Sequence, residues 1–152
     1  MKELFESLKH VDNVDGYVFL DTCFIFDLLD RGLDLKNGYN YAVSSFTVEE
    51  LLKVGRHKDK IQLRKLLKSF PFVVVNIDVH IGDWVSEKKF VNSIDKDLLK
   101  YVADPSDAVL MAVAIKNNSI VLTKDKHHLF TVMLENFLKK YNLKVLKEIK
   151  DL

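Results

Sequence analysis

The segment YVFLDTCFIFDLLD, residues 17–30, indicates the fold class of this chain. Residues 17–20 form a short apolar run that is typical of a strand buried on both faces. Asp21 ends that run, and residues 22–30 then show helical spacing of apolar side chains, with Gly32 as the expected stop. A buried strand that leads directly into a helix is the repeating unit of an α/β fold.

Further strand and helix patterns follow along the chain. Short apolar runs predict strands at residues 41–44, 72–77, 119–122 and 143–149, and helical spacing predicts helices over residues 2–9, 58–70, most of 78–102 and 129–141. Thr47-Val48-Glu49-Glu50 indicates a capping box, and Asp104-Pro105 indicates another helix start. Alternating strands and helices predict an α/β fold with a central, mostly parallel sheet flanked by helices.

Length and composition set the class of protein. The 152 residues are 48% hydrophobic, which predicts one domain over 1–152, with a helical extension at 1–15 and a helix and strand at 129–152. A net charge of +1 and one cysteine argue against a disordered chain and a disulfide scaffold. With no long apolar segment, these features predict a cytoplasmic protein.

Four carboxylates are predicted to lie at the carboxyl edge of the sheet. Asp21 and Asp125 each follow a predicted strand, and Glu50 and Asp107 lie in the first turns of predicted helices. Ligands bind at this edge in open α/β sheets. Gathered carboxylates repel one another, and a hard divalent cation removes that repulsion. The set predicts a Mg²⁺ or Mn²⁺ site suited to phosphodiester hydrolysis.

Each acid also has an alternative, purely structural role. Asp21 can cap the helix that follows it, and Glu50 can complete the capping box with Thr47. Asp107 in a first helical turn is favoured by the helix dipole, and Asp125 can be a turn residue. The sequence also leaves open whether Asp104 or Glu49 joins the site.

Four segments, in their order and spacing, resemble one known family. They are VFLDT at residues 18–22, SSFTVEELL at 44–52, DAVLMAVA at 107–114 and IVLTKD at 120–125. Together they resemble the PIN-domain family of ribonucleases, which includes the VapC-type toxins of toxin–antitoxin pairs. The resemblance extends over about residues 17–130 and implies a three-layer α/β/α fold.

The resemblance also implies a site and a function. The implied catalytic acids are Asp21, Glu50, Asp107 and Asp125. Of these, Asp21, Asp107 and Asp125 would hold Mg²⁺ or Mn²⁺, and the hydroxyls of Thr123 and Thr22 would support them. The implied activity is metal-dependent endonucleolytic cleavage of RNA, by a chain that is often a homodimer. Toxin members are held inactive by an antitoxin protein.

Other functions stay open at this point. An RNA-processing nuclease would share the toxin's chemistry, and a catalytically silent PIN-like module would bind RNA or protein without cleaving it. A haloacid-dehalogenase-like phosphatase is disfavoured because its second Asp would fall at Cys23, which we expect to be a packed thiol. A response-regulator receiver is disfavoured because residues 11–15 match its paired acids poorly.

Basic residues offer candidate contacts to RNA. Residues 53–68 hold seven Lys and Arg and one acid, a pattern that is typical of a solvated helix face. The alternative is that Arg64 and Lys65 contact RNA phosphates. Lys124 and Lys126 flank Asp125 and are further RNA-binding candidates, whereas the adjacent residues 127 and 128, both His, lack the usual spacing of zinc ligands.

Overall fold

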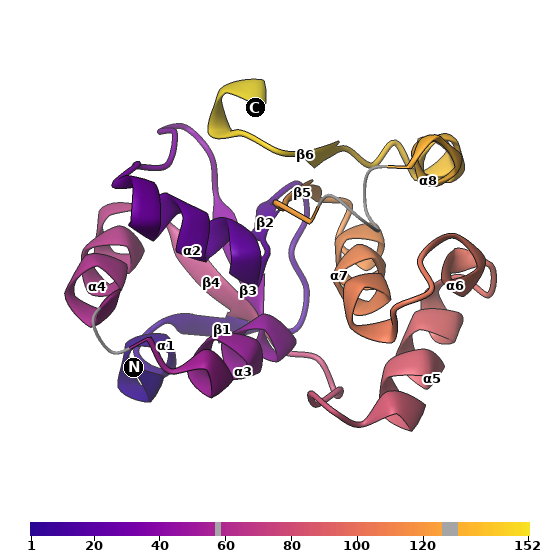
Figure 1. Ribbon diagram of the computed structural model, residues 1–152, viewed down its shortest axis with the longest axis horizontal. Helices are drawn as coiled ribbons and strands as arrows, with labels where there is room; N and C mark the ends of the chain where they lie inside the picture. Colours follow the sequence, from indigo (N-terminus) through magenta and orange to yellow (C-terminus); the bar gives the residue numbers. More distant parts are fainter. Residues whose placement is uncertain (57–58, 126–130) are drawn as a thin grey trace.

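The computed structural model describes residues 1–56, 59–125 and 131–152 (Figure 1). Its strands are β1 (Lys9–Val11), β2 (Val18–Leu20), β3 (Tyr41–Ser44), β4 (Phe72–Val75), β5 (Ile120–Leu122) and β6 (Val145–Leu146). They form one sheet in the order β1-β4-β3-β2-β5-β6, and every neighbouring pair is parallel. The predicted α/β fold is therefore confirmed, with a sheet that is wholly parallel among the described residues.

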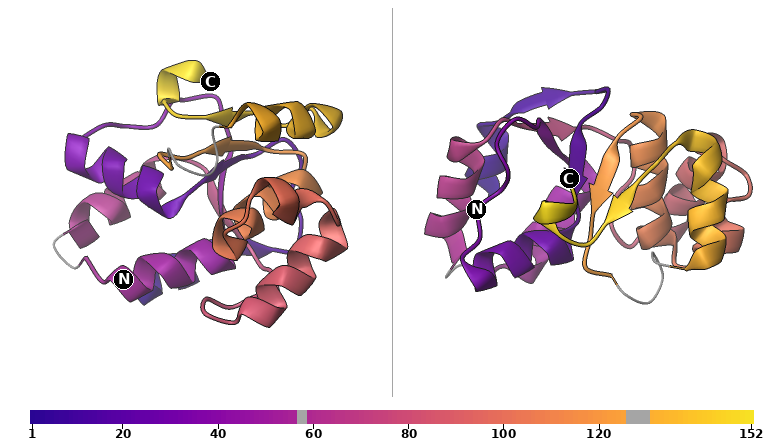
Figure 2. Two further views of the ribbon diagram at one scale, coloured as in Figure 1. Left: turned by 45° about the vertical axis from the view of Figure 1, so that its right-hand side comes forward. Right: turned by 90° about the horizontal axis from the view of Figure 1, so that it is seen from above.

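Helices cover both faces of this sheet, which makes three layers (Figures 1 and 2). They are α1 (Lys2–Glu6), α2 (Thr22–Arg31), α3 (Ser45–Val54), α4 (Lys60–Ser69), α5 (Trp84–Ile94), α6 (Leu98–Tyr101), α7 (Pro105–Lys116) and α8 (Val132–Leu138). Helices α1, α2 and α4 lie on one side, and α5 to α8 lie on the other. No helix among the described residues is long and apolar enough to cross a membrane.

Two apolar cores follow from the alternation of side chains along the strands. Phe19 and Val121 pack with α5, α7 and α8, whereas Leu20 and Leu122 pack with α1, α2 and α4. The strands are apolar on both faces because helices bury both. Helix α7 is buried from Ala108 to Ala114, as expected for a helix whose apolar residues surround its axis.

Two helices begin as their sequence predicts. The Asp21 side chain caps α2, which ends at Gly32 in the left-handed conformation, at φ 61°. The Asp104 side chain accepts a hydrogen bond from the backbone N–H of Ser106, and Pro105 is the first residue of α7. These caps place Asp107 in the first turn of α7, where the sequence predicts it.

The predicted capping box at the start of α3 is wrong. The cap is Ser44, the last residue of β3, whose hydroxyl oxygen accepts from the backbone N–H of Thr47 at 3.1 Å. The helix therefore begins at Ser45, directly after the strand, and Thr47 is buried within its first turn. Glu50 then lies in the second turn, and its carboxylate has no capping role.

One strand near the N-terminus, β1, was not predicted from the sequence. Residues 1–15 contain the expected helix, α1, but also β1, which pairs with β4 at the sheet edge. Lys9 and His10 of β1 are exposed, so its sequence shows no apolar run that would indicate a strand. Between residues 131 and 152 the structure has α8 and then β6, which pairs with β5.

The order of strands marks where a ligand would bind. From β2 the chain passes to β3 on one side, whereas β5 lies on the other side of β2. Open α/β sheets bind ligands outside the carboxyl ends of the strands at such a switch point. In this chain the carboxyl ends of β2 and β5 carry Asp21 and Thr123.

Candidate functional site

The structure brings the four predicted acids together in one crevice of about 520 Å³. Asp21 follows β2, Asp125 lies just beyond β5, Asp107 comes from the first turn of α7, and Glu50 comes from α3. The rest of the lining is Thr22, Cys23, Phe26, Val54 and Arg56. The sequence predicted this convergence from a parallel sheet and from helices that begin near its carboxyl edge.

Thr123 joins two of the acids. Leu20 and Leu122 are paired in the sheet, so the next residues, Asp21 and Thr123, lie side by side. The buried Thr123 hydroxyl donates to Oδ2 of Asp21 at 2.7 Å and accepts from the backbone N–H of Asp125 at 3.1 Å. The predicted supporting threonine therefore holds one carboxylate and the backbone that carries another.

Asp21 is both a helix cap and a member of the site. Its Oδ1 accepts from the backbone N–H of Thr22 at 2.7 Å, which caps α2. Its Oδ2 accepts from the Cys23 thiol at 3.2 Å in addition to the Thr123 hydroxyl. The cap uses Oδ1, and Oδ2 lies among the groups of the crevice, so the capping role does not exclude the predicted role in the site.

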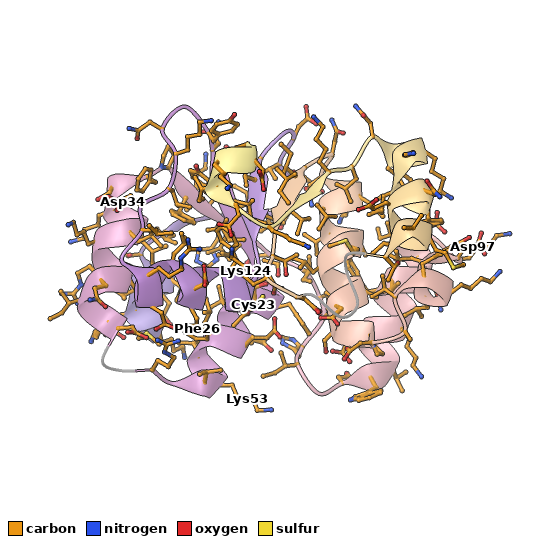
Figure 3. The ribbon with its side chains drawn as sticks, turned by 45° about the horizontal axis from the view of Figure 1, so that its top comes forward. Cys23, Phe26, Asp34, Lys53, Asp97 and Lys124 are labelled. Carbon is orange, nitrogen blue, oxygen red and sulfur yellow. The ribbon has the colours of Figure 1, made fainter. Side chains whose placement is uncertain are left out.

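Cys23 lies in the crevice, where the sequence analysis expected a packed thiol. Figure 3 shows it beside Lys124 near the middle of the molecule, with Phe26 on the same helix. Its sulfur accepts from the backbone N–H of Lys124 at 3.3 Å and lines the crevice. Burial, and then the charge of Asp21, raise the pKa of this thiol to about 11, so it stays protonated and can donate to that carboxylate.

Glu50 and its neighbour Glu49 point to different places. The Thr22 hydroxyl donates to Oε1 of Glu50 at 3.3 Å, inside the crevice. Glu49 instead pairs with His80 and accepts from the backbone N–H of Ile81 at 3.0 Å. Successive helical side chains point about 100° apart, which separates the two. The structure thus turns Glu50 toward the other acids and Glu49 away from them.

Three carboxyl groups of the crevice have pKa values above their usual range. Burial, and then the charges of Asp125 and Asp104, raise the pKa of Asp107 to about 8; a side-chain hydrogen bond with Asp125 adds to this rise. Burial and the charge of Asp21 raise the pKa of Glu50 to about 7. Burial also raises the pKa of Asp21. A cation bound among these carboxylates would favour their charged forms and would therefore compete with protons for the site.

Two cations near the crevice are already paired with other acids. The Lys124 ammonium lies 2.7 Å from Glu148 and 3.7 Å from Asp27. Arg56 pairs with Asp30 and with Asp59. Lys124 is thus held by ion pairs, which leaves it less free to steer a phosphate than the sequence suggested. Lys126 and the histidine pair that follows it lie outside the described residues.

The donor set of the crevice fits a hard divalent cation. Carboxylate oxygens are the ligands that Mg²⁺ and Mn²⁺ prefer, and an opposite charge lowers the raised pKa values of Asp107 and Glu50. Among the described residues, however, no three His, Cys, Asp or Glu side chains stand close enough to hold a metal ion. The carboxylates would have to close around a bound cation.

Arg64 and Lys65 lie on the exposed side of α4 and do not line the crevice. Lys65 lines a separate groove between α2 and α4. Their contact with RNA phosphates stays a prediction. Reversal of both charges with unchanged RNA affinity and salt dependence would refute it.

Replacing Thr123 with valine should weaken both the fold and the site. The isosteric change removes one hydrogen bond to Asp21 and leaves the Asp125 N–H without its acceptor, at a cost of about 1–3 kcal/mol in the free energy of unfolding. Loss of an orienting partner of this kind lowers metal affinity by about 10–100-fold. Urea unfolding and calorimetric titration with Mn²⁺ measure the two effects. Thr123→Ser keeps the hydroxyl and should restore most of both; a valine variant as stable as the parent would contradict the role of this hydroxyl.

The comparisons with known proteins bear on the fold. No protein-family model matches the chain, and no curated protein matches it. Among solved structures it is similar to a PilT N-terminus domain protein from Sulfolobus solfataricus P2, with 14% identity over 89% of this chain and 88% of that one, and a TM-score of 0.46. It is also similar to VapBC-1 from nontypeable Haemophilus influenzae, with 17% identity over 86% of this chain and 97% of that one, and a TM-score of 0.46.

Proposed function

We propose that this chain is a divalent-metal-dependent endoribonuclease of the PIN type. The observation that carries the proposal is the convergence of Asp21, Glu50, Asp107 and Asp125 in one crevice, where burial, and then repulsion between the acids, raises the pKa values of Glu50 and Asp107. Such a charge concentration is costly for a fold and useful for binding a cation and a phosphodiester. It favours the nuclease over a silent binding module, which needs no such set.

Asp21, Asp107 and Asp125 are the residues that would hold the metal. When bound, Mg²⁺ or Mn²⁺ would neutralise phosphate charge and acidify a water molecule. Thr123 keeps Asp21 in place, and the Cys23 thiol donates to the same carboxylate oxygen. This support fixes the orientation of Asp21 before substrate arrives.

Glu50 is the candidate general base. Its pKa of about 7 is close to the value at which a carboxylate can both accept and release a proton at neutral pH. The Thr22 hydroxyl holds Oε1, so the other oxygen is free to accept a proton from the attacking water. Asp104 caps α7 and acts on the site through its charge, which helps to raise the pKa values of Glu50 and Asp107.

The biological setting is a further part of the proposal. A toxin and an RNA-processing nuclease would use the same crevice, so the geometry does not separate them. A homodimer and an antitoxin partner, implied by the sequence resemblance, stay predictions. The acids would serve the same chemistry in either setting.

Cleavage of RNA by the purified protein tests the proposal directly. We expect cleavage with Mg²⁺ or Mn²⁺, loss of cleavage with EDTA, and recovery when excess metal is restored. Without a cation, the negatively charged carboxylates would repel the phosphodiester. The measurement is the appearance of labelled fragments from a mixed pool of RNA sequences. Cleavage that continues unchanged in EDTA would contradict the metal dependence. Absence of both cleavage and metal binding would favour the silent module, whereas metal binding without cleavage of that pool would indicate a narrow RNA target.

A further inference from the structure

A second hollow adjoins the carboxylate crevice, and most of its lining residues take no part in the chemistry proposed above. It measures about 340 Å³ and shares Thr22, Glu50 and Val54 with the crevice. The rest of its lining is Lys53, Ile81, Gly82, Trp84 and Ser106. A polymer with one phosphodiester among the carboxylates would therefore place a neighbouring unit in this hollow.

Trp84 lines this hollow and is largely exposed. It is the only tryptophan of the chain, it begins α5, and it is 61% exposed. The Asp83 side chain caps the helix by accepting from the backbone N–H of Ser86 at 3.1 Å, so the backbone that carries the ring is held in place. Among the described residues the ring has no aromatic partner. Aromatic rings placed in this way serve as stacking platforms for nucleic-acid bases.

Lys53 and Ser106 add polar contacts beside the ring. Lys53 is exposed at the end of α3 (Figure 3). It forms no ion pair within the described part of the chain, in contrast to Lys124 and Arg56. The Ser106 hydroxyl donates to Oε1 of the buried Glu87 at 2.9 Å, which leaves the hydroxyl oxygen able to accept. The hollow thus offers a cation for a phosphate and an acceptor for a base N–H.

We propose that the hollow formed by Lys53, Trp84 and Ser106 binds an unpaired base of single-stranded RNA, stacked on Trp84, with a flanking phosphate on Lys53. This inference rests on the proposed function and narrows its substrate to single-stranded RNA, because a base inside a duplex is already stacked on both faces. A protein partner is less favoured, since the hollow combines one ring with a cation and a hydroxyl and is continuous with the acids.

The single tryptophan allows binding to be measured apart from cleavage. In the Asp107→Asn background with Mg²⁺ present, we expect a short single-stranded RNA to quench Trp84 fluorescence, and a duplex of the same sequence to quench it far less. In the same background, Trp84→Ala should raise the Kd for labelled single-stranded RNA by about 5- to 100-fold, measured by fluorescence anisotropy. Trp84→Phe should retain most of the affinity. Met133→Ala, at a site 67% exposed on α8, is the matched control and should change nothing.

The outcomes separate this inference from the proposed function. Quenching and Trp84-dependent affinity in a protein that never cleaves RNA would support the base site while the nuclease proposal fails. Cleavage of RNA by the parent protein, with affinity unchanged in Trp84→Ala, would overturn the base site and leave the nuclease standing. Failure to bind single-stranded RNA, or equal quenching by duplex, also overturns it. Loss of binding to a protein partner in Trp84→Ala, with RNA affinity intact, would assign the hollow to that partner instead.

Discussion

Replacing Asp107 with asparagine is expected to abolish metal-dependent RNA cleavage. The carboxylate sits at the start of α7 and faces Asp125 and Asp21, whose charges reach it. An amide of the same shape keeps the packing but removes one negative ligand from the set that would hold the cation. We expect cleavage to fall by about 10²-fold or more, the scale on which single electrostatic groups of a catalytic site act.

The control for this variant is Asp97→Asn. Asp97 lies on the far edge of the molecule from Cys23 (Figure 3), and its one ion pair within the described residues is with Lys100, at 2.9 Å. An exposed pair of this kind contributes about 0–1 kcal/mol to stability, so its loss should leave cleavage unchanged. Initial rates of fragment formation at saturating Mg²⁺ compare the two variants. Cleavage by pure Asp107→Asn at the parental rate would remove this residue from the proposed site.

The metal-free protein is expected to lose stability as pH rises from about 4 to 8. The folded pKa of Asp107, about 8, lies above the value of about 3.9 for an unfolded chain, so the folded state binds a proton that the unfolded state has released. This penalty is absent below pH of about 4 and complete above pH of about 8. Glu50, with a folded pKa of about 7, adds a penalty over the lower part of the same window.

Asp107→Asn should flatten that dependence and stabilise the metal-free protein at alkaline pH. After allowance for solvent screening of a partly exposed group, we expect a gain of about 1–3 kcal/mol in the free energy of unfolding at pH 8 and little change at pH 5. Mg²⁺ should stabilise the parent protein more at pH 8 than at pH 5, because it binds the deprotonated carboxylates. Urea unfolding at the two pH values, with and without Mg²⁺, measures both effects. If the free energy of unfolding of the parent and of Asp107→Asn changed with pH in parallel, the pKa of Asp107 would not be raised in the folded protein.

Local patterns were sufficient for most of the fold. The apolar run that ends at Leu20 and the apolar residues of α7 predict buried elements. Both are buried in the structure because helices cover both faces of the sheet. The cap at Asp104 and the stop at Gly32 are local features of the backbone, so their sequence signals were reliable. Strand β1 was missed because its exposed side chains carry no apolar pattern, and it forms only through pairing with β4.

The site needed more than local patterns. The capping box at Thr47 was a plausible signal, but Ser44 supplies the cap because the strand and helix join without a loop. Because Ser44 is the cap, Glu50 has no capping role, and its side chain lines the crevice instead. The environment of Cys23 was also missed, since a cysteine within an apolar helical pattern gives no sign of the carboxylate that its thiol contacts.

The amino-acid sequence by itself determined that this chain builds a parallel α/β sheet and that four acids follow its strands, because strand periodicity, helix caps and the positions of carboxylates are properties of neighbouring residues. Only the tertiary structure decided which of these groups act on one another. The raised pKa values of Asp107 and Glu50, the bond between Thr123 and Asp21, and the hollow at Trp84 arise between residues that are distant in the chain. Electrostatic repulsion, burial and hydrogen bonding depend on distance in space, and packing of the sheet against its helices sets that distance.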